Sequence, residues 1–225
     1  MKITFLGHAS LQLEIKGKTI IVDPFISANP KASNIDLNTI QPDYILITHA
    51  HQDHILDVEV LAKQKNATIV SNWEIATYYG NKGFTSHPMN HGGSWNFDFG
   101  KVTYTNAVHS SSFPDGTYGG NPGGFIIQGE HKTIYISGDT ALTFDMQLIP
   151  KKVQLDIAIL PIGDNFTMDV DDAIIASDFV QCDKVLGVHY DTFGYIEIDK
   201  EAAIKKFFDA GKDLMLLAIG ESIEL

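Results

Sequence analysis

Four side chains that can bind a metal ion lie within six residues, in the stretch His49-Ala50-His51-Gln52-Asp53-His54. This stretch directly follows an apolar run, residues 44–48, which is typical of a short buried strand. The ligands would then lie where a rigid element turns into a loop. Because desolvating three imidazoles and a carboxylate is costly unless something compensates for it, the cluster predicts a metal-binding protein.

Three further candidate ligands lie downstream, each after a strand-like run. His109 follows residues 101–108, Asp139 follows residues 132–137 and a glycine, and His189 follows residues 184–188. Placement at strand ends holds functional groups on rigid elements while they stay accessible in loops. Each residue also has a structural interpretation when it is taken alone. A lone histidine is most often a surface or core residue, and Asp139 could be a helix N-cap.

The order of these motifs resembles that of the metallo-β-lactamase superfamily. The motif His-x-His-x-Asp-His, a lone histidine, Gly138-Asp139-Thr140 and a late histidine follow one another as they do in that superfamily, over about residues 1–200. Within it, the chain is similar to small metal-dependent hydrolases near the ascorbate-6-phosphate lactonase branch. Shorter motifs support this branch and lie at residues 6–10, 23–25, 109–116, 160–164 and 189–191.

The resemblance implies a binuclear metal site, with seven ligands that divide between two ions. Carried over residue by residue, the first ion would be held by His49, His51 and His109, the second by Asp53, His54 and His189, and Asp139 would bridge them. Imidazoles with carboxylates and no thiolate suit divalent ions, zinc first, with manganese and iron as alternatives. A hydroxide bridging two such ions could attack a small ester, lactone or phosphoester, so a metal-dependent hydrolase is expected.

Two residues near the start of the chain are expected to assist this site. His8 would contact the substrate or protonate the leaving group, and together with Asp53 it forms the expected catalytic pair. Its alternative is a plain loop histidine. Asp23, which precedes Pro24, is expected to accept a hydrogen bond from a ligand imidazole, or else to be a turn residue.

Substrate-binding residues are expected in loops after later strands. Asn165 and Thr167 follow the strand-like run 155–160, and Tyr190 follows His189 at the expected mouth of the pocket. Thr167 or Asp169 could instead cap the helix beyond. Residues 27–38 and 110–122 are loops that would shape the pocket. The glycine-rich residues 116–124 lack the spacing of a phosphate-binding loop and are expected to form a hairpin turn.

Composition narrows the classes of partner. The net charge is −12, and all 16 basic residues are lysines. Arginine makes most specific contacts to nucleic acids, so a small molecule is the expected partner and a nucleic acid is not. No apolar run approaches the roughly 20 residues of a membrane span, so no membrane association is expected. The single cysteine, Cys182, fits a reducing cytoplasm. The sequence neither requires nor excludes a homo-oligomer.

Three other functions stay open on the sequence alone. A phosphodiesterase or nuclease would be favoured by lysines around the pocket. A di-iron redox protein would resemble a related branch with His-x-Glu-x-Asp, in which a carboxylate stands where this chain has His51. Imidazole at that position favours zinc and hydrolysis. A binding module without catalysis would have no reason to keep all seven costly ligands in register.

The elements that must position these residues follow from apolar periodicity. Strands are predicted within residues 3–6, 11–15, 19–22, 44–48, 95–137, 155–160 and 184–188, and helices over residues 57–65, 73–81, 142–149, 172–179 and 200–210, with a final extended stretch after the last helix. Two β-rich blocks, each followed by helices, indicate an α/β or an α+β fold. The resemblance narrows this to an αββα sandwich of two mixed β-sheets with helices on the outer faces, formed by one domain over residues 1–225.

Overall fold

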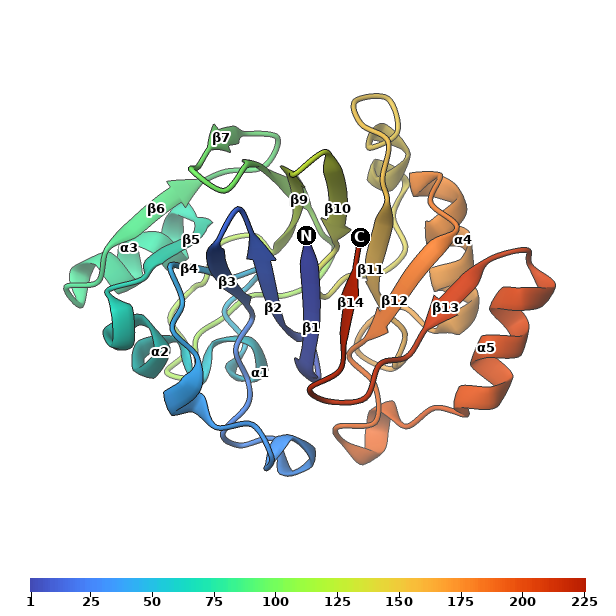
Figure 1. Ribbon diagram of the computed structural model, residues 1–225, viewed down its shortest axis with the longest axis horizontal. Helices are drawn as coiled ribbons and strands as arrows, with labels where there is room; N and C mark the ends of the chain where they lie inside the picture. Colours follow the sequence, from blue (N-terminus) through green and yellow to red (C-terminus); the bar gives the residue numbers. More distant parts are fainter.

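The computed structural model describes residues 1–225 and shows two seven-stranded sheets packed face to face (Figure 1). The first sheet has the order β14-β1-β2-β3-β4-β5-β6. Its strands are β1 (Lys2–Gly7), β2 (Ser10–Ile15), β3 (Lys18–Val22), β4 (Tyr44–Leu46), β5 (Thr68–Asn72), β6 (Ser86–Met89) and β14 (Ser222–Glu224). Neighbours from β14 to β3 are antiparallel, and neighbours from β3 to β6 are parallel.

The second sheet has the order β13-β12-β11-β10-β9-β8-β7. Its strands are β7 (Ser94–Asn96), β8 (Lys101–Asn106), β9 (Gly123–Gly129), β10 (Lys132–Ile136), β11 (Ile157–Pro161), β12 (Lys184–Val188) and β13 (Asp213–Met215). Neighbours from β7 to β10 are antiparallel, and those from β10 to β13 are parallel. Both sheets therefore have the same succession of pairings.

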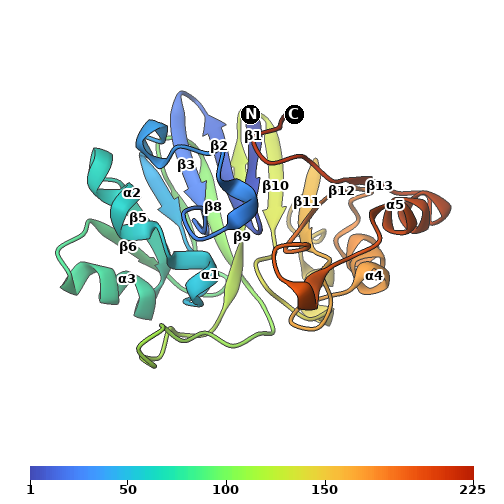
Figure 2. The ribbon, with the colours of Figure 1, turned by 90° about the horizontal axis from the view of Figure 1, so that it is seen from below.

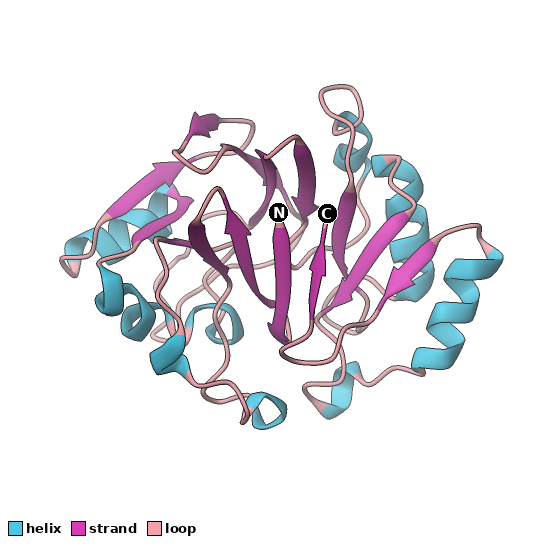
Figure 3. Ribbon diagram, viewed as in Figure 1, coloured by secondary structure: helices cyan, strands magenta, loops and turns pink.

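Helices cover the outer face of each sheet, as Figures 2 and 3 show. Beside the first sheet lie α1 (Gln52–Ile55), α2 (Val58–Lys65) and α3 (Trp73–Asn81), and beside the second lie α4 (Val170–Val180) and α5 (Lys200–Asp209). Short 3-10 helices span Pro30–Ala32, Leu37–Thr39, Phe144–Leu148 and Gly194–Ile196. This is the predicted αββα arrangement. None of the helices has the length and apolar character needed to span a lipid bilayer.

The core has three layers of apolar side chains. The largest layer, with 22 buried residues, lies between the two sheets. Of the other two layers, one lies between the first sheet and its helices and one between the second sheet and its helices. The parallel strand β11 is buried along its whole length, because it is covered on both faces, and it is accordingly a continuous apolar run. Edge strand β7 is fully exposed. Burial on two faces therefore makes the central strands rigid supports for the loops at their ends.

Polar side chains set where the main helices begin. Asn72, Asp169 and Asp199 are the N-cap residues of α3, α4 and α5, and each accepts a hydrogen bond from a backbone N–H of the first turn. Of the two predicted capping candidates before α4, Asp169 and not Thr167 is the cap. Asp139 caps no helix, because the next helical turn begins at Phe144 after Thr143.

The structure differs from the sequence-based prediction at several elements. Strands β5 and β6 were not predicted, and the short helix α1 lies within the ligand motif itself. The predicted helix over residues 142–149 is a 3-10 helix, Phe144–Leu148. The turn expected within residues 116–124 is displaced to residues 113–117, where a bridge between Ser112 and Tyr118 closes it. Short elements carry too few residues to show a clear period.

Candidate metal centre

All the candidate ligands lie at one edge of the sandwich. His8 follows β1, Asp23 follows β3, and residues 49–54 follow β4. His109, Asp139 and His189 follow β8, β10 and β12. Within each sheet these strands run in the same direction, so their carboxyl ends meet at the same edge. The topology thus gathers residues that are up to 181 positions apart, from His8 to His189.

Three imidazoles form what we call the first ligand group, His49, His51 and His109. Their candidate ligand atoms all lie within 4.8 Å of one another. His49 Nε2 is 3.0 Å from His51 Nδ1. Two imidazole nitrogens this close repel through their lone pairs unless they share a proton or a cation. The group therefore has the chemistry and the spacing of a metal site.

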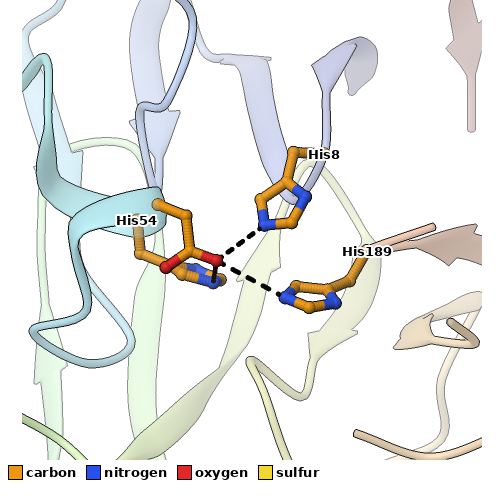
Figure 4. Close-up of side chains that lie close together, drawn as sticks. His8, His54 and His189 are labelled. Atoms are coloured by element: carbon orange, nitrogen blue, oxygen red, sulfur yellow. Dashed lines mark hydrogen bonds and ion pairs between the residues drawn. The ribbon is translucent and has the colours of Figure 1, made fainter. Parts of the chain in front are cut away.

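The second ligand group, Asp53, His54 and His189, has its candidate ligand atoms within 4.8 Å of one another and of His8 (Figure 4). The Oδ2 atom of Asp53 lies 3.0 Å from His8 Nε2, 3.8 Å from His54 Nε2 and 3.7 Å from His189 Nε2. His8 Nε2 either donates to Asp53 or binds a cation together with it. His8 Nδ1 is 2.9 Å from Thr192 Oγ1. His8 thus contacts Asp53 directly.

Asp139 lies between the two groups. Its Oδ2 atom is 3.0 Å from His189 Nε2 and 3.3 Å from His54 Nε2, both of the second group. The same atom is 3.7 Å from His109 Nε2 and 3.8 Å from His49 Nε2, both of the first group. One buried carboxylate oxygen therefore faces four imidazoles, which is the placement expected of a bridging ligand.

Asp23 fixes the orientation of two of these imidazoles. It accepts hydrogen bonds from the Thr48 backbone N–H (2.8 Å), from the Thr48 hydroxyl (2.6 Å) and from His54 Nδ1 (2.9 Å). Because the Thr48 hydroxyl donates to Asp23, it can only accept from His49 Nδ1, which is 3.0 Å away. Both imidazoles then carry their proton on Nδ1 and turn the Nε2 lone pair toward the site.

The carboxylates of the centre are ionised. Burial raises the pKa of Asp139, but His189 and His54 outweigh this effect and hold it well below the usual range. The pKa of Asp53 is likewise below its usual range, because His54, His189 and His8 outweigh its burial. The buried charge of Asp139 and the partly buried charge of Asp53 both attract cations to the centre.

The pKa shifts of the histidines depend on how strongly the neighbouring carboxylates counteract burial. Burial lowers the pKa of His54 and His189, but the carboxylates dominate and raise it, to about 9 for His189. Burial lowers the pKa of His49 and also that of His51 and His109, where the carboxylates compensate less. Burial lowers the pKa of His8 to about 4. The first ligand group is therefore neutral, the protonation state that binds metal.

Two observations test whether divalent ions fit these residues. His54 Nε2 is buried and makes no hydrogen bond, although it faces the carboxylates. The donor set contains imidazole nitrogens and carboxylate oxygens without sulfur, which suits zinc, manganese or iron. A buried polar nitrogen without a hydrogen-bond partner is costly, and a metal ion would satisfy it in place of a proton. The residues present therefore fit metal ions.

A cavity of about 320 Å³ opens onto the two ligand groups. Its lining consists of His51, Asp53, His109, Ser110, Asp139, Phe166, His189 and Phe193. We call it the metal cavity. Ser110 belongs to the predicted pocket loop 110–122, and its hydroxyl lies 3.2 Å from His51 Nε2. The other predicted pocket loop, residues 27–38, contributes no residue to this lining.

The residues expected to bind substrate do not line the metal cavity. Asn165 and Thr167 belong to the turn after β11, and it is Phe166 between them that lines the cavity. Tyr190 is 7% exposed and packs in the apolar layer between the second sheet and its helices. Burying an aromatic ring there is more favourable than placing it in water. His8 is 1% exposed and does not line this cavity either, so its expected contact with substrate stays a prediction.

Sequence reasoning missed Thr48, Ser110, Thr192, Phe166 and Phe193. Thr48 and Ser110 adjoin ligand residues, so their positions carried a usable signal. Thr192 carried none, because its contact with His8 joins residues that are 184 positions apart. The two phenylalanines resemble core residues in the sequence, and only the loop geometry turns them toward the cavity.

Comparison with known proteins agrees with this geometry. The family described as the β-lactamase superfamily domain matches residues 2–189. The chain belongs to the metallo-β-lactamase superfamily. Superfamily relatives described as UPF0173 metal-dependent hydrolases, from Flavobacterium johnsoniae and Christiangramia forsetii, are 75% and 67% identical to it over the full length of both chains. Its close homologues are thus named as metal-dependent hydrolases. The similarity to the ascorbate-6-phosphate lactonase branch stays a prediction.

Solved structures show the same fold. Igni18, described as a metallo hydrolase from the archaeon Ignicoccus hospitalis, is 33% identical, with a TM-score of 0.90 over 99% of this chain and 97% of that one. CmlA, described as a diiron β-hydroxylase from Streptomyces venezuelae, is 14% identical, with a TM-score of 0.78 over 100% of this chain and 54% of that one. The second likeness concerns the fold alone, so the metal-dependent chemistry must be argued from the site.

Proposed function

We propose that this superfamily member is a binuclear hydrolase that cleaves a small ester, lactone or phosphoester with two divalent metal ions, zinc in the first place. The observation that carries the proposal is the position of Asp139. One carboxylate oxygen faces His49 and His109 on one side and His54 and His189 on the other, at 3.0 to 3.8 Å. Two ligand groups joined by one carboxylate fit two neighbouring ions.

The proposed ligands are the first group for one ion, the second group for the other, and Asp139 for both. When bound, the ions would supply a water molecule of lowered pKa as nucleophile and a Lewis acid for the scissile oxygen. Asp23 and Thr48 keep the His49 and His54 lone pairs aimed at the site before any metal binds. This preorganisation removes part of the entropy cost of ordering the ligands.

Asp53 and His8 have separate parts in this proposal. Asp53 lines the metal cavity, so its carboxylate touches substrate and can take part in proton transfer. His8 is buried behind Asp53, held at its other nitrogen by Thr192. We assign His8 as a positioning residue for Asp53 and not as the acid for the leaving group.

Metal content and hydrolysis, measured together, test the proposal. Protein purified without added metal is analysed by elemental mass spectrometry and assayed with 4-nitrophenyl esters and bis(4-nitrophenyl) phosphate. We expect about two zinc or manganese ions per chain and hydrolysis that chelation abolishes. The variant His51→Ala is expected to lose both metal and hydrolysis.

The matched control is His131→Asn, which changes an exposed histidine in the turn between β9 and β10 and should leave both quantities unchanged. Asparagine tolerates the left-handed conformation of this residue, whose φ is 63°. Predominant iron with electron transfer and no hydrolysis would replace the proposal by a redox function. A protein that takes up no metal even on titration would refute it.

A further inference from the structure

The lining of the metal cavity divides into metal-binding chemistry and two phenyl rings. Five of its eight residues are candidate ligands, and Ser110 contacts one of them. Phe166 and Phe193 make up the rest. No lysine lines the cavity, and the chain contains no arginine. Apart from bound metal ions and the histidines that would hold them, nothing in the lining could therefore balance a negative charge on the substrate.

Both rings are unusually accessible for phenylalanine. Phe166 is 52% exposed and Phe193 is 39% exposed, and the ring of neighbouring Tyr195, which is 79% exposed, lies 6.3 Å from that of Phe166. Apolar side chains grouped in this way around a cavity mark a binding surface, because water contact with them is unfavourable. Here they adjoin the reacting groups.

The turn that carries Phe166 is held in an unusual conformation. Asp164 and Asn165 have φ values of 62° and 54°, in the left-handed region that non-glycine residues seldom adopt. The Asp164 backbone N–H donates to Met168 O (3.1 Å), and the Asn165 N–H donates to the Asp164 carboxylate (2.6 Å). Such a conformation persists only where its surroundings fix it. The exposed ring is thus presented by a defined turn.

The loop that carries Phe193 is fixed in a similar way. Asp191 has a φ of 60°, and its backbone N–H donates to Ile196 O (2.7 Å) while its carboxylate accepts from the Ile198 N–H (3.1 Å). The Phe193 ring lies 5.4 Å from that of His8 and 6.1 Å from that of Phe25. This ring therefore adjoins the residue that positions Asp53.

The two loops are also locked to each other beside a candidate ligand. A Cβ atom added at Gly163 would lie 2.1 Å from the backbone oxygen of His189, so glycine alone allows this close approach. His189 itself has a φ of 58°. The turn with Phe166 thus packs directly against the backbone of His189.

From these contacts we propose that the substrate carries an uncharged apolar or aromatic group beside its scissile bond, as a neutral ester or lactone does, and that Phe166 and Phe193 bind this group. The inference rests on the proposed hydrolase function and narrows its substrate class. A phosphorylated group carries about −1.5 to −2 charges at neutral pH. Between two phenyl rings it would lose water without gaining a cation, which disfavours it.

A matched pair of esters tests the inference on the metal-loaded protein. 4-Nitrophenyl butyrate and 4-nitrophenyl 4-sulfobutyrate share a leaving group and an acyl chain length, and only the second carries a charge on the acyl group. We expect kcat/KM to favour the neutral ester by about 100-fold or more, since charge burial outweighs the effect of one methylene. Phe166→Ala and Phe193→Ala should each lower kcat/KM for the butyrate about 10-fold, mainly through KM, with metal content unchanged.

The matched control is Phe208→Ala, which removes an even more exposed phenyl ring (78%) from α5, where it does not line the cavity. Its kinetics should equal those of the unmodified protein. Equal hydrolysis of the two esters, or unchanged KM in both cavity variants, would overturn the inference and leave the hydrolase proposal standing. Hydrolysis of 4-nitrophenyl phosphate, a doubly charged monoester, in place of either ester would overturn the inference as well. Metal-loaded protein that hydrolyses none of the three compounds would contradict the hydrolase proposal itself.

Discussion

The first sheet, β14 with β1–β6, and the second, β7–β13, have the same succession of strand pairings but different loops at the functional edge. Counted from its antiparallel end, the second strand of each sheet is followed by a histidine, His8 after β1 and His109 after β8. The fourth strand is followed by an aspartate, Asp23 after β3 and Asp139 after β10. Equivalent positions in the two halves therefore carry the same residue types, although no repeat is visible in the sequence.

The two aspartates show how one position can serve two purposes. Both are buried, Asp23 to 1% exposure and Asp139 to 3%. Asp23 uses its oxygens on Thr48 and His54 Nδ1, whereas Asp139 faces the Nε2 atoms of four histidines. Backbone position brings a carboxylate to the site, but the atoms around it decide whether it supports a ligand or acts as one.

The largest effect expected from this comparison separates the two aspartates. Asp139→Ala removes the carboxylate that joins both ligand groups, so metal binding should fail and hydrolysis should fall at least about 1,000-fold. Asp23→Ala leaves every ligand in place but frees two imidazoles, so metal affinity should fall about 10- to 100-fold. Metal titration followed by mass spectrometry measures both.

For the free energy of unfolding, we expect the larger loss in Asp23→Ala and the smaller loss in Asp139→Ala. Asp23→Ala leaves the buried Thr48 N–H and hydroxyl without their acceptor, which costs about 1–3 kcal/mol. Asp139→Ala should cost the metal-free protein less, because it removes no backbone hydrogen bond. Denaturant unfolding with chelator present makes the comparison. Equal effects of both variants on metal and on stability would show that the two positions are not distinct.

A smaller effect separates the two histidines. His109→Ala removes a proposed ligand, so one ion per chain should be lost. His8→Ala removes the partner of Asp53 and should weaken metal binding only about 10-fold while retaining both ions at saturation. Metal stoichiometry at saturating zinc distinguishes the two results. Loss of one ion in His8→Ala would instead identify His8 as a ligand.

The smallest effect concerns the carboxyl ends of the sixth strands in the same count, β5 and β12. The first sheet has Asn72 there, and the second has His189. Asn72 accepts from the Ile75 N–H and donates to Gly119 O, so it caps a helix and holds a loop. Asn72→Ala should lower the free energy of unfolding by about 1 kcal/mol and leave metal content unchanged. Thermal unfolding together with metal analysis tests this. A lost ion would place Asn72 in the centre after all.

Apolar periodicity predicted most of the strands and helices, because long buried strands and amphipathic helices keep a clear period. Their αββα arrangement was predicted from the resemblance to the superfamily. Strands β5 and β6 were not predicted. Strand β6 contains His87 and Pro88 and has no apolar alternation. The candidate ligands could be named because their types and order are unusual. The pocket lining could not be predicted, because Asn165 and Thr167 were expected there from their place after a strand, whereas the left-handed turn places Phe166 at the cavity.

Residues 222–224 of strand β14 pair with residues 2–4 of β1. The first sheet is therefore completed only when a segment synthesised late pairs with one synthesised early. At about 5–20 residues per second, β1 has left the ribosome for on the order of ten seconds or more before its partner exists. Throughout that interval the strand that leads to His8 has an open edge, which can pair with another nascent chain. The yield of soluble protein should therefore depend on chaperones that protect this edge and on the speed of translation.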